Sequence, residues 1–187
     1  MLKALKKFWK WLWTSNSVLS WFVSFLLAFI LVRFIFYPLL GLVLSTSLPL
    51  VVIESNSMNH FGNFDEWFQA QEDFYGNFNI VKEEAEKWPF RSGLDKGDVA
   101  LIRGKSFDDL EIGDVIIFRP PSQEKAVIHR IVVKTEDKVE TKGDANIGQL
   151  GQEKNIAPEQ VAGVAILRIP YIGWLKLMFV EILRDFR

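Results

Sequence analysis

The feature that most constrains this chain is a long apolar segment close to its N-terminus. Residues 17–44 read "SVLSWFVSFLLAFILVRFIFYPLLGLVL", and Arg33 is their only charged residue. About 20 predominantly apolar residues cross the hydrocarbon layer of a bilayer as a helix. An arginine near one end of such a helix extends its long side chain toward the polar interface. The segment therefore predicts a transmembrane anchor, with the rest of the chain held at a membrane.

The charges on either side of this segment predict its orientation. Residues 1–16 carry four lysines among aromatic side chains, whereas few cationic residues directly follow the apolar segment. Lys and Arg are enriched on the cytoplasmic side of membrane helices. We therefore expect a single-pass protein of the cell membrane, with residues 1–16 in the cytoplasm and the chain beyond about residue 45 outside.

A cleavable signal peptide is the alternative interpretation of the same segment. Ser45 and Ser47 resemble the small residues of a cleavage site. The apolar stretch is, however, far longer than the roughly 7–15 apolar residues of a signal peptide. Its length favours an uncleaved anchor over residues 17–44.

The composition excludes several kinds of functional site. The 187 residues contain no cysteine, two histidines (His60 and His129) and a net charge of −1. Disulfides, thiolate metal ligands and cysteine nucleophiles are therefore excluded, and two histidines offer little material for a zinc site. We expect no metal, and the balanced charge does not indicate nucleic acid as a partner. Any serine–histidine mechanism has to use one of the two histidines.

The pattern beyond the anchor predicts a mainly β domain over residues 45–170. Short runs rich in Val and Ile are separated by Gly, Pro and Asp, which is typical of strands joined by turns. The runs are "LPLVVI", "DVALIRG", "DVIIFRP", "AVIHRIVVKT", "KVETKG" and "VAGVAILRIP". Three Gly-Asp pairs, at 97–98, 113–114 and 143–144, suit turn geometry, and we expect at least two of them to be turns.

Two segments of this part of the chain predict helices. Residues 61–93 are aromatic and acidic with a near-helical period, so we expect a helical insertion whose aromatic side chains pack on the domain or lie at the membrane interface. Asn79 is expected to cap its second helix and Pro89 to end it. Residues 171–187 predict an amphipathic helix that lies on the membrane or on the domain, because its apolar stretch is too short for a second crossing. Its expected apolar face comprises Ile172, Leu175, Phe179, Ile182 and Phe186.

The polar stretch "ESNSMNH" at residues 54–60 is a candidate for nucleophilic chemistry. A serine hydroxyl such as that of Ser57 needs a base, and histidine is the usual base near neutral pH. His60 lies three residues away, but known triads take their members from distant segments. His129 lies within the strand-like run "AVIHRIVV". A buried strand histidine is as a rule structural, so spacing alone leaves this pair undecided.

The order of several short motifs adds a resemblance. The motifs "PLVVIESNSMNH", "KGDVALI", "LEIGDVIIF", "VIHRIV", "ETKGDAN" and "VAGVAILRIPYIGWLKLM" follow one another behind the apolar segment. Together they resemble type I signal peptidase, in its archaeal and endoplasmic-reticulum branch, where a histidine stands in place of a lysine base. The resemblance covers residues 48–60 and 94–178 and the anchor, and it implies a signal-peptidase-like β-rich catalytic domain.

The resemblance also implies roles for individual residues. Ser57 matches the nucleophile, His129 the general base and Asp144 the acid that orients the base. Ser55 matches the first serine of the same box, where it helps the Ser57 backbone N–H to bind the oxyanion. Met58 is expected to pack beneath the nucleophile, and His60 is expected to be a bystander.

The implied substrates are signal peptides with small residues one and three positions before the cut. An extended peptide adds to a sheet edge with alternate side chains in pockets, and Val52, Ile53 and Glu54 lead into the serine box as such an edge. The resemblance implies no cofactor. The expected partners are signal peptides, the lipid bilayer and the protein-translocation machinery, and the anchor would raise the effective concentration of substrate at the site.

The sequence departs from the family pattern at two places, which leaves alternatives open. Asn56 stands where the family commonly has glycine, and the aspartate that commonly follows the Gly143-Asp144 box is missing, with Glu153 the next acid. One alternative is therefore an inactive membrane-tethered β domain that binds peptides or a partner through its aromatic insertion. Another is a related serine protease with a different target, such as a membrane-protein or prepilin-like substrate.

Overall fold

The structure is a computed structural model that describes residues 2–185. It divides into two units at the boundary between Val43 and Leu44. This boundary falls at the end of the predicted anchor, so the apolar segment and the expected β domain are separate units. Phe186, which was expected on the apolar face of the C-terminal helix, lies outside the described residues.

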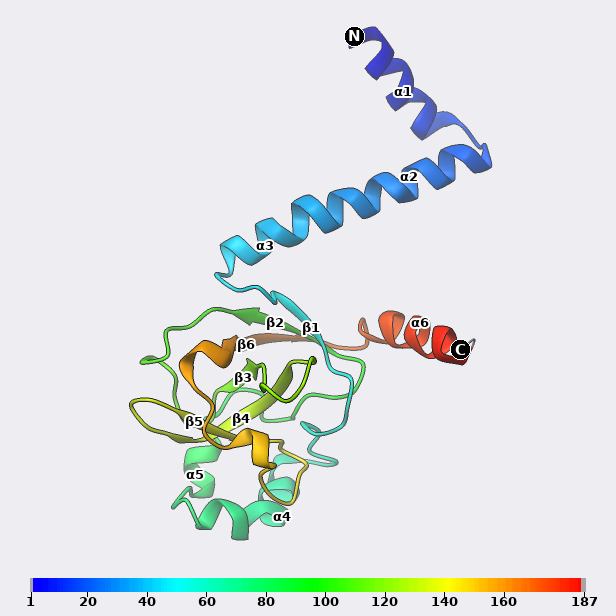
Figure 1. The fold of residues 1–187 in the computed structure, drawn as a ribbon. Helices are drawn as coiled ribbons and strands as arrows, with labels where there is room; N and C mark the ends of the chain where they lie inside the picture. The colour runs from blue at the N-terminus through cyan, green and yellow to red at the C-terminus, as the bar shows by residue number, and fades with distance from the viewer. Residues whose placement is uncertain (1, 186–187) are drawn as a thin grey trace. The chain divides into compact units, whose positions relative to one another are not determined.

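The described part of the first unit is helical except at residues 15–17 (Figure 1). Ser17 caps the second helix by accepting a hydrogen bond from the backbone N–H of Ser20. A π-helical stretch precedes Pro38, whose missing N–H and bulky ring disturb regular α-helical hydrogen bonding. The elements are α1 (Leu2–Thr14), α2 (Val18–Leu31), the π-helical η1 (Val32–Phe36) and α3 (Tyr37–Val43).

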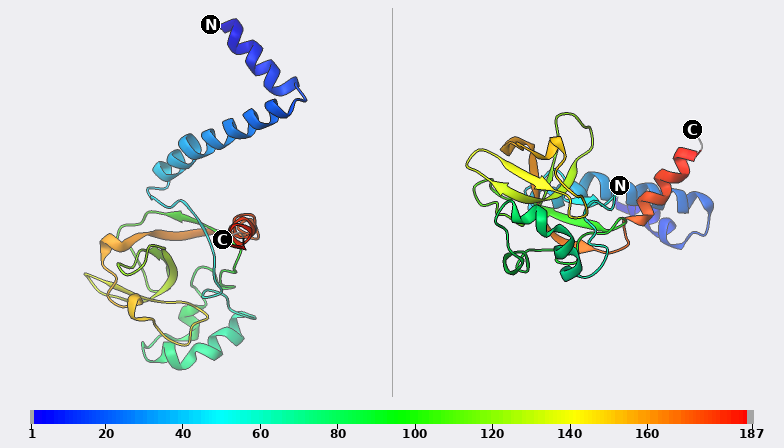
Figure 2. Two further views of the ribbon diagram at one scale, coloured as in Figure 1. Left: turned by 45° about the vertical axis from the view of Figure 1, so that its right-hand side comes forward. Right: turned by 90° about the horizontal axis from the view of Figure 1, so that it is seen from below.

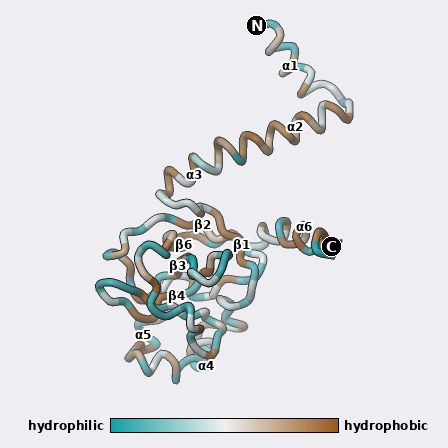
Figure 3. Tube along the Cα trace, viewed as in Figure 1, coloured by the Kyte–Doolittle hydropathy of each residue, from teal (hydrophilic) through white to brown (hydrophobic). Residues whose placement is uncertain are grey.

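The helical run Val18–Val43 is long and apolar enough to span a membrane or to act as a signal sequence. Its 26 residues correspond to about 39 Å at 1.5 Å per residue, against about 30 Å of hydrocarbon. Figure 3 shows its hydrophobic character along the trace. Arg33 lies in η1 and is exposed.

The second unit is built on one antiparallel sheet of six strands in the order β1-β2-β6-β3-β4-β5. The expected β-rich domain is thus present, and β1 and β5 form its two edges. Three clusters of buried side chains pack on the sheet, and they include Ile117, Val132 and Ile116, respectively. The strands are β1 (Leu50–Val52), β2 (Val99–Arg103), β3 (Val115–Phe118), β4 (Val127–Lys134), β5 (Val139–Lys142) and β6 (Val161–Ile169).

Two of the three Gly-Asp pairs form turns that require glycine. Gly97 has φ 93° and Gly113 has φ 95°, a left-handed conformation that side chains disfavour. Gly143 has no positive φ, and its role, described below, is to allow close approach of the backbone.

The insertion forms α4 (Phe64–Gly76) and α5 (Lys82–Ala85), which lie close to β4 in Figures 1 and 2. Asn63 and Glu66 form a capping box at the start of α4. Contrary to expectation, Val81 and not Asn79 occupies the N-cap position of α5. Asn79 adopts a left-handed conformation with φ 57°. Most of the insertion's aromatic side chains pack on the domain, one of the two placements expected, whereas Phe61 is 73% exposed. Buried members of this cluster are Trp67, Phe68, Tyr75 and Trp88, packed with Val132 of β4.

The last helix, α6 (Trp174–Asp185), is fixed to the second unit at its N-terminal end. Leu177 is buried, and the Trp174 ring lies against Gly97. The expected apolar face points away from the domain, since Ile172, Leu175, Phe179 and Ile182 are all more than half exposed.

Candidate active site

Ser57 lies in a turn that follows edge strand β1. Beyond Val52 the chain leaves the sheet, and Met58 inserts its fully buried side chain into the core. The Met58 carbonyl accepts a hydrogen bond from Leu94 N–H at 2.8 Å. Met58 therefore packs beneath the turn, as expected. Ser57 stays partly exposed beside the sheet edge.

The structure brings Ser57 and His129 together across 72 positions of sequence. His129 Nε2 lies 3.0 Å from Ser57 Oγ. The histidine projects from the middle of β4 and is only 4% exposed. This distance is within the reach that a base needs to take a proton from a hydroxyl. His60, by contrast, makes no hydrogen bond to Ser57 in the described structure.

The carboxylate that contacts His129 is Glu153, not Asp144. His129 Nδ1 hydrogen-bonds Glu153 Oε1, and the Glu153 side chain is fully buried. Glu153 ends a short 3₁₀ turn, η2 (Gly151–Glu153), and its Oε2 accepts the Leu150 N–H. With a carboxylate at Nδ1, the favoured neutral tautomer carries its proton there, which leaves Nε2 free to accept the serine proton.

Asp144 has a different set of partners, so the expectation that it orients His129 is not met. Its Oδ2 accepts hydrogen bonds from Arg130 Nη2 at 2.6 Å and from His60 Nε2 at 2.8 Å, and its Oδ1 accepts one from Arg130 Nε at 2.9 Å. Burial opposes ionisation of this carboxyl, but Arg130 and His60 outweigh it and lower the pKa of Asp144 to about 2. Asp144 does not contact His129 because Arg130 and His60 already donate hydrogen bonds to its carboxylate oxygens.

His60 is thus not a bystander in the fold. It is 5% exposed, and its ring stacks on Trp67 with centroids 3.9 Å apart. The Trp67 indole N–H donates to the Asp144 carbonyl at 2.9 Å. The aromatic insertion therefore reaches the site through Trp67, and His60 and Trp67 together support Asp144 from two directions.

The loop that contains Asp144 contacts the backbone of Ser57. Ala145 N–H donates to the Ser57 carbonyl at 2.9 Å. A Cβ at Gly143 would lie 2.8 Å from the Ser57 carbonyl oxygen and 2.9 Å from His129 Nε2. The buried pair of Arg130 and Asp144 consequently positions the backbone beside the serine, and only glycine fits at position 143.

Ser55 lies next to the nucleophile candidate. Its Oγ is 3.1 Å from Ser57 Oγ, and the Ser57 N–H approaches it at 3.5 Å. Both groups therefore lie beside the Ser57 hydroxyl. Asn56 between them has no positive φ, so asparagine at this position carries no left-handed strain.

Of the residues expected to bind substrate, Val52 ends edge strand β1, and Ile53, Glu54 and Ser55 follow it in the chain. Among residues 2–185, β2 is the only strand paired with β1. Ile53 exchanges hydrogen bonds with Asp98 and Gly97 on the β2 side. Because backbone groups alternate along a strand, those of Val52 and Glu54 point toward the open edge. Ile53 itself is 2% exposed and belongs to the core.

Glu54 carries two cationic neighbours. Its carboxylate accepts hydrogen bonds from Lys125 Nζ at 2.8 Å and Lys176 Nζ at 2.9 Å. These two contacts lower the pKa of Glu54. The contact with Lys176 links the serine segment to α6, so Glu54 has a structural tie in addition to its place at the edge.

Reasoning from sequence missed the roles of Glu153, Gly143 and the Arg130–Asp144 pair. One signal was available for Glu153, because it is the only acidic residue between Asp144 and Glu159. None of the protein-family models matches this chain, and no curated protein matches it either. The site is therefore defined by its geometry: a serine, a histidine and a buried carboxylate in hydrogen-bonded series beside an open sheet edge.

Proposed function

We propose that this chain is a membrane-bound serine endopeptidase that removes N-terminal signal peptides from preproteins. The observation that carries the proposal is the series Ser57 Oγ, His129 and Glu153, with His129 Nε2 at 3.0 Å from the hydroxyl and Nδ1 on a buried carboxylate. This is the arrangement of roles that activates a serine in unrelated hydrolases. The ordered motifs that resemble type I signal peptidase support the same reaction and supply the substrate class.

The proposed reaction uses these groups in two stages. Ser57 Oγ attacks the scissile carbonyl while His129 Nε2 takes the hydroxyl proton, and Glu153 stabilises the imidazolium. The protonated His129 then gives this proton to the leaving amine, which releases the mature protein and leaves an acyl-enzyme on Ser57. Water, deprotonated by His129, hydrolyses the ester and releases the signal peptide.

The oxyanion of each tetrahedral intermediate is assigned to the Ser57 N–H and the Ser55 hydroxyl. Both donors lie beside Ser57 Oγ, and oxyanion donors of this kind contribute about 2.7–4 kcal/mol to transition-state stabilisation. Ser55 keeps its place through the turn that Met58 anchors. We expect Ser55→Ala to lower kcat and leave folding intact.

The substrate peptide is proposed to add to the open edge of β1. The outward backbone groups of Val52 and Glu54 offer hydrogen bonds to an extended substrate peptide whose scissile bond lies at Ser57. The apolar run Val18–Val43 would tether the domain to the bilayer from which a signal peptide emerges. The exposed apolar face of α6 suits contact with the same surface. We also propose that the chain contacts the protein-translocation machinery.

Cleavage of a preprotein by the purified full chain in detergent tests the proposal. We expect a cut directly after an Ala-x-Ala sequence, and we expect Ser57→Ala and His129→Ala to abolish it. Ser106→Ala is the matched control, because Ser106 is an exposed turn serine outside the site. Cleavage retained in Ser57→Ala would refute the mechanism.

The same preparation separates the two alternatives. A serine-reactive phosphonate should label Ser57 in the wild-type chain, and failure to label a folded chain would favour the inactive peptide-binding domain. The burial of Trp67, Phe68 and Tyr75 counts against that alternative, whose expected binding surface is the aromatic insertion. A profile of cleaved peptides with no preference for small residues at the two positions would favour a protease with another target.

A further inference from the structure

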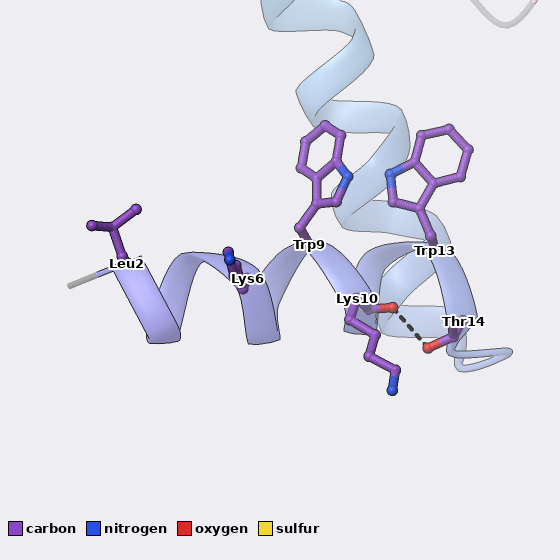
Figure 4. Close-up of a pocket in the computed structure, with 6 residues that line it drawn as sticks. All are labelled: Leu2, Lys6, Trp9, Lys10, Trp13 and Thr14. Atoms are coloured by element: carbon purple, nitrogen blue, oxygen red, sulfur yellow. Dashed lines mark hydrogen bonds between the residues drawn. The ribbon is translucent and has the colours of Figure 1, made fainter.

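Helix α1 has two chemically distinct faces that the proposed peptidase reaction does not use. At about 100° per residue, its four lysines fall within an arc of about 100°, and apolar side chains occupy the rest of the circumference. Figure 4 shows Leu2, Trp9 and Trp13 leaving the helix on one side, while Lys10 points away from them. The lysines of this face are Lys3, Lys6, Lys7 and Lys10.

Much of the apolar face of α1 is exposed, although α2 contacts α1 and Trp11 and Leu12 are partly buried. Phe8 is 45%, Trp9 56% and Trp13 74% exposed. Trp9 and Trp13 pack on each other with ring centroids 6.1 Å apart, beside the stems of Lys6 and Lys10, and together they line a shallow hollow. Indole rings beside lysine ammonium groups are typical of the headgroup region of a bilayer, where one part of each side chain is apolar and the other wet.

The chain breaks its helix between α1 and the apolar run that follows. Residues 15–17 are not helical. The Ser20 hydroxyl donates to the carbonyls of Ser15 and Ser17, and Ser17 caps α2. These bonds satisfy backbone groups that the interruption would leave open. The break therefore separates a basic amphipathic helix from a segment apolar enough to span a membrane.

We propose that α1 lies in the plane of the membrane surface and binds anionic phospholipid headgroups through Lys3, Lys6, Lys7 and Lys10. Charge complementarity selects this occupant, because the face carries four cations and no acidic residue. The apolar face with Phe8 and the tryptophans then enters the boundary between headgroups and acyl chains. The inference relies on the proposed membrane span, but not on peptidase activity. Such binding gives the anchor a preference for membranes with anionic lipids and fixes the depth of the anchor in the bilayer.

The absence of cysteine in the chain makes a clean test possible. Single variants Phe8→Cys, on the apolar face, and Thr14→Cys, on the polar side, are labelled with an environment-sensitive fluorophore in the full-length protein. Each is placed in nanodiscs of phosphatidylcholine alone or of phosphatidylcholine mixed with phosphatidylglycerol. We expect the label at position 8 to shift to the blue and to lose acrylamide quenching in the anionic discs, while the label at position 14 stays accessible.

Charge variants identify the lysines as the cause. Each lysine near an anionic surface strengthens association about fivefold, so Lys6→Gln with Lys10→Gln should lower the ratio of docked to undocked helix about 25-fold. Lys87→Gln with Lys154→Gln is the matched control, because both lysines are exposed and lie in the second unit. Raising salt from about 0.1 M to about 1 M should release the docked helix by screening.

Several outcomes overturn the inference. Equal protection of position 8 in neutral and anionic discs would mean that the lysines do not recognise lipid charge. A label that stays accessible in both would mean that α1 does not dock. Protection that depends on two chains per disc would assign the face to a second copy. Because no result depends on cleavage, Ser57→Ala protein gives the same result, and failure here is distinct from failure of the proposed function.

Discussion

Glu153 is fully buried against His129, so its carboxylate acts directly on the imidazole. Glu153→Gln keeps the size of the side chain and removes the charge that stabilises the imidazolium. We predict that kcat for a signal-peptide substrate falls about 10²–10⁴-fold with little change in KM. Steady-state kinetics in detergent measure both kcat and KM. An activity loss smaller than that of Asp144→Asn in an equally stable protein would return the acid role to Asp144.

Asp144 is expected to influence stability as a function of pH. Its pKa is about 2 in the folded chain against an ordinary value of 3.8, which corresponds to about 2 kcal/mol. A lowered pKa stabilises the folded state above the unfolded value, and this contribution is lost as pH falls from about 4 toward 2. Urea unfolding across this window should show a loss in the wild type that Asp144→Asn lacks. Parallel curves would contradict the prediction.

Gly143 is predicted to be essential because of what surrounds it. An alanine Cβ would approach the Ser57 carbonyl oxygen to 2.8 Å and His129 Nε2 to 2.9 Å, so the serine and its base have to move apart. We expect Gly143→Ala to lower kcat at least about 10²-fold, as misplacement by about 1 Å does. Gly148→Ala is the control, because nothing lies within 4 Å of its Cβ. Equal activity of the two variants would show that the loop adapts.

The residues of the site differ in how far the sequence reveals them. Ser57 and His129 could be predicted because each lies in a short motif and the motifs keep their order. The acid could not, because the path of residues 144–153 has no periodic pattern and decides which carboxylate reaches His129. Asp144 instead contacts Arg130, which follows His129 on the opposite face of β4, and this pairing depends on strand register.

At the scale of elements, β1 is predicted to bind substrate through backbone groups that β2 does not use. Val52→Pro removes the N–H that points to the open edge, and proline is tolerated at such edge positions. We expect the melting temperature to hold and kcat/KM to fall about fivefold to tenfold, the worth of one hydrogen bond. Val52→Ala, which keeps the N–H, is the side-chain control.

Val51→Pro is the matched backbone control for this prediction. By alternation from Ile53, the Val51 N–H faces β2, so its loss breaks the β1–β2 ladder. We expect this variant to melt at a lower temperature. If both proline variants lose stability and neither changes KM at permissive temperature, the substrate does not add to this edge.

The sequence predicts most elements but not their contacts. The strands and the apolar helix follow from runs of Val, Ile and Leu, because local periodicity reflects burial. The π-helical turn before Pro38 and the left-handed Asn79 depend on backbone hydrogen bonding that composition does not encode. The inward packing of Trp67 on His60 is likewise tertiary, and it decides that the insertion supports the site.

For the whole molecule, the division at Val43 and Leu44 separates the apolar helical run from the sheet and the candidate site. The sheet, its three buried clusters and every residue of the candidate site belong to the second unit. The first unit carries the apolar run and the basic helix α1. The two functions proposed for the chain, peptide cleavage and membrane attachment, therefore reside in units with separate internal contacts.

This division predicts that residues 44–187 alone cleave a short soluble peptide with a kcat within a fewfold of the full chain. Cleavage of a preprotein embedded in vesicles should instead fall about 10²–10⁴-fold, because the tether no longer raises the local concentration of enzyme. Both rates are measured on the same two proteins, and the melting temperature of residues 44–187 establishes that they fold. Equal losses on both substrates would mean that the first unit takes part in forming the site, whereas no loss on either would mean that attachment through the apolar face of α6 is sufficient.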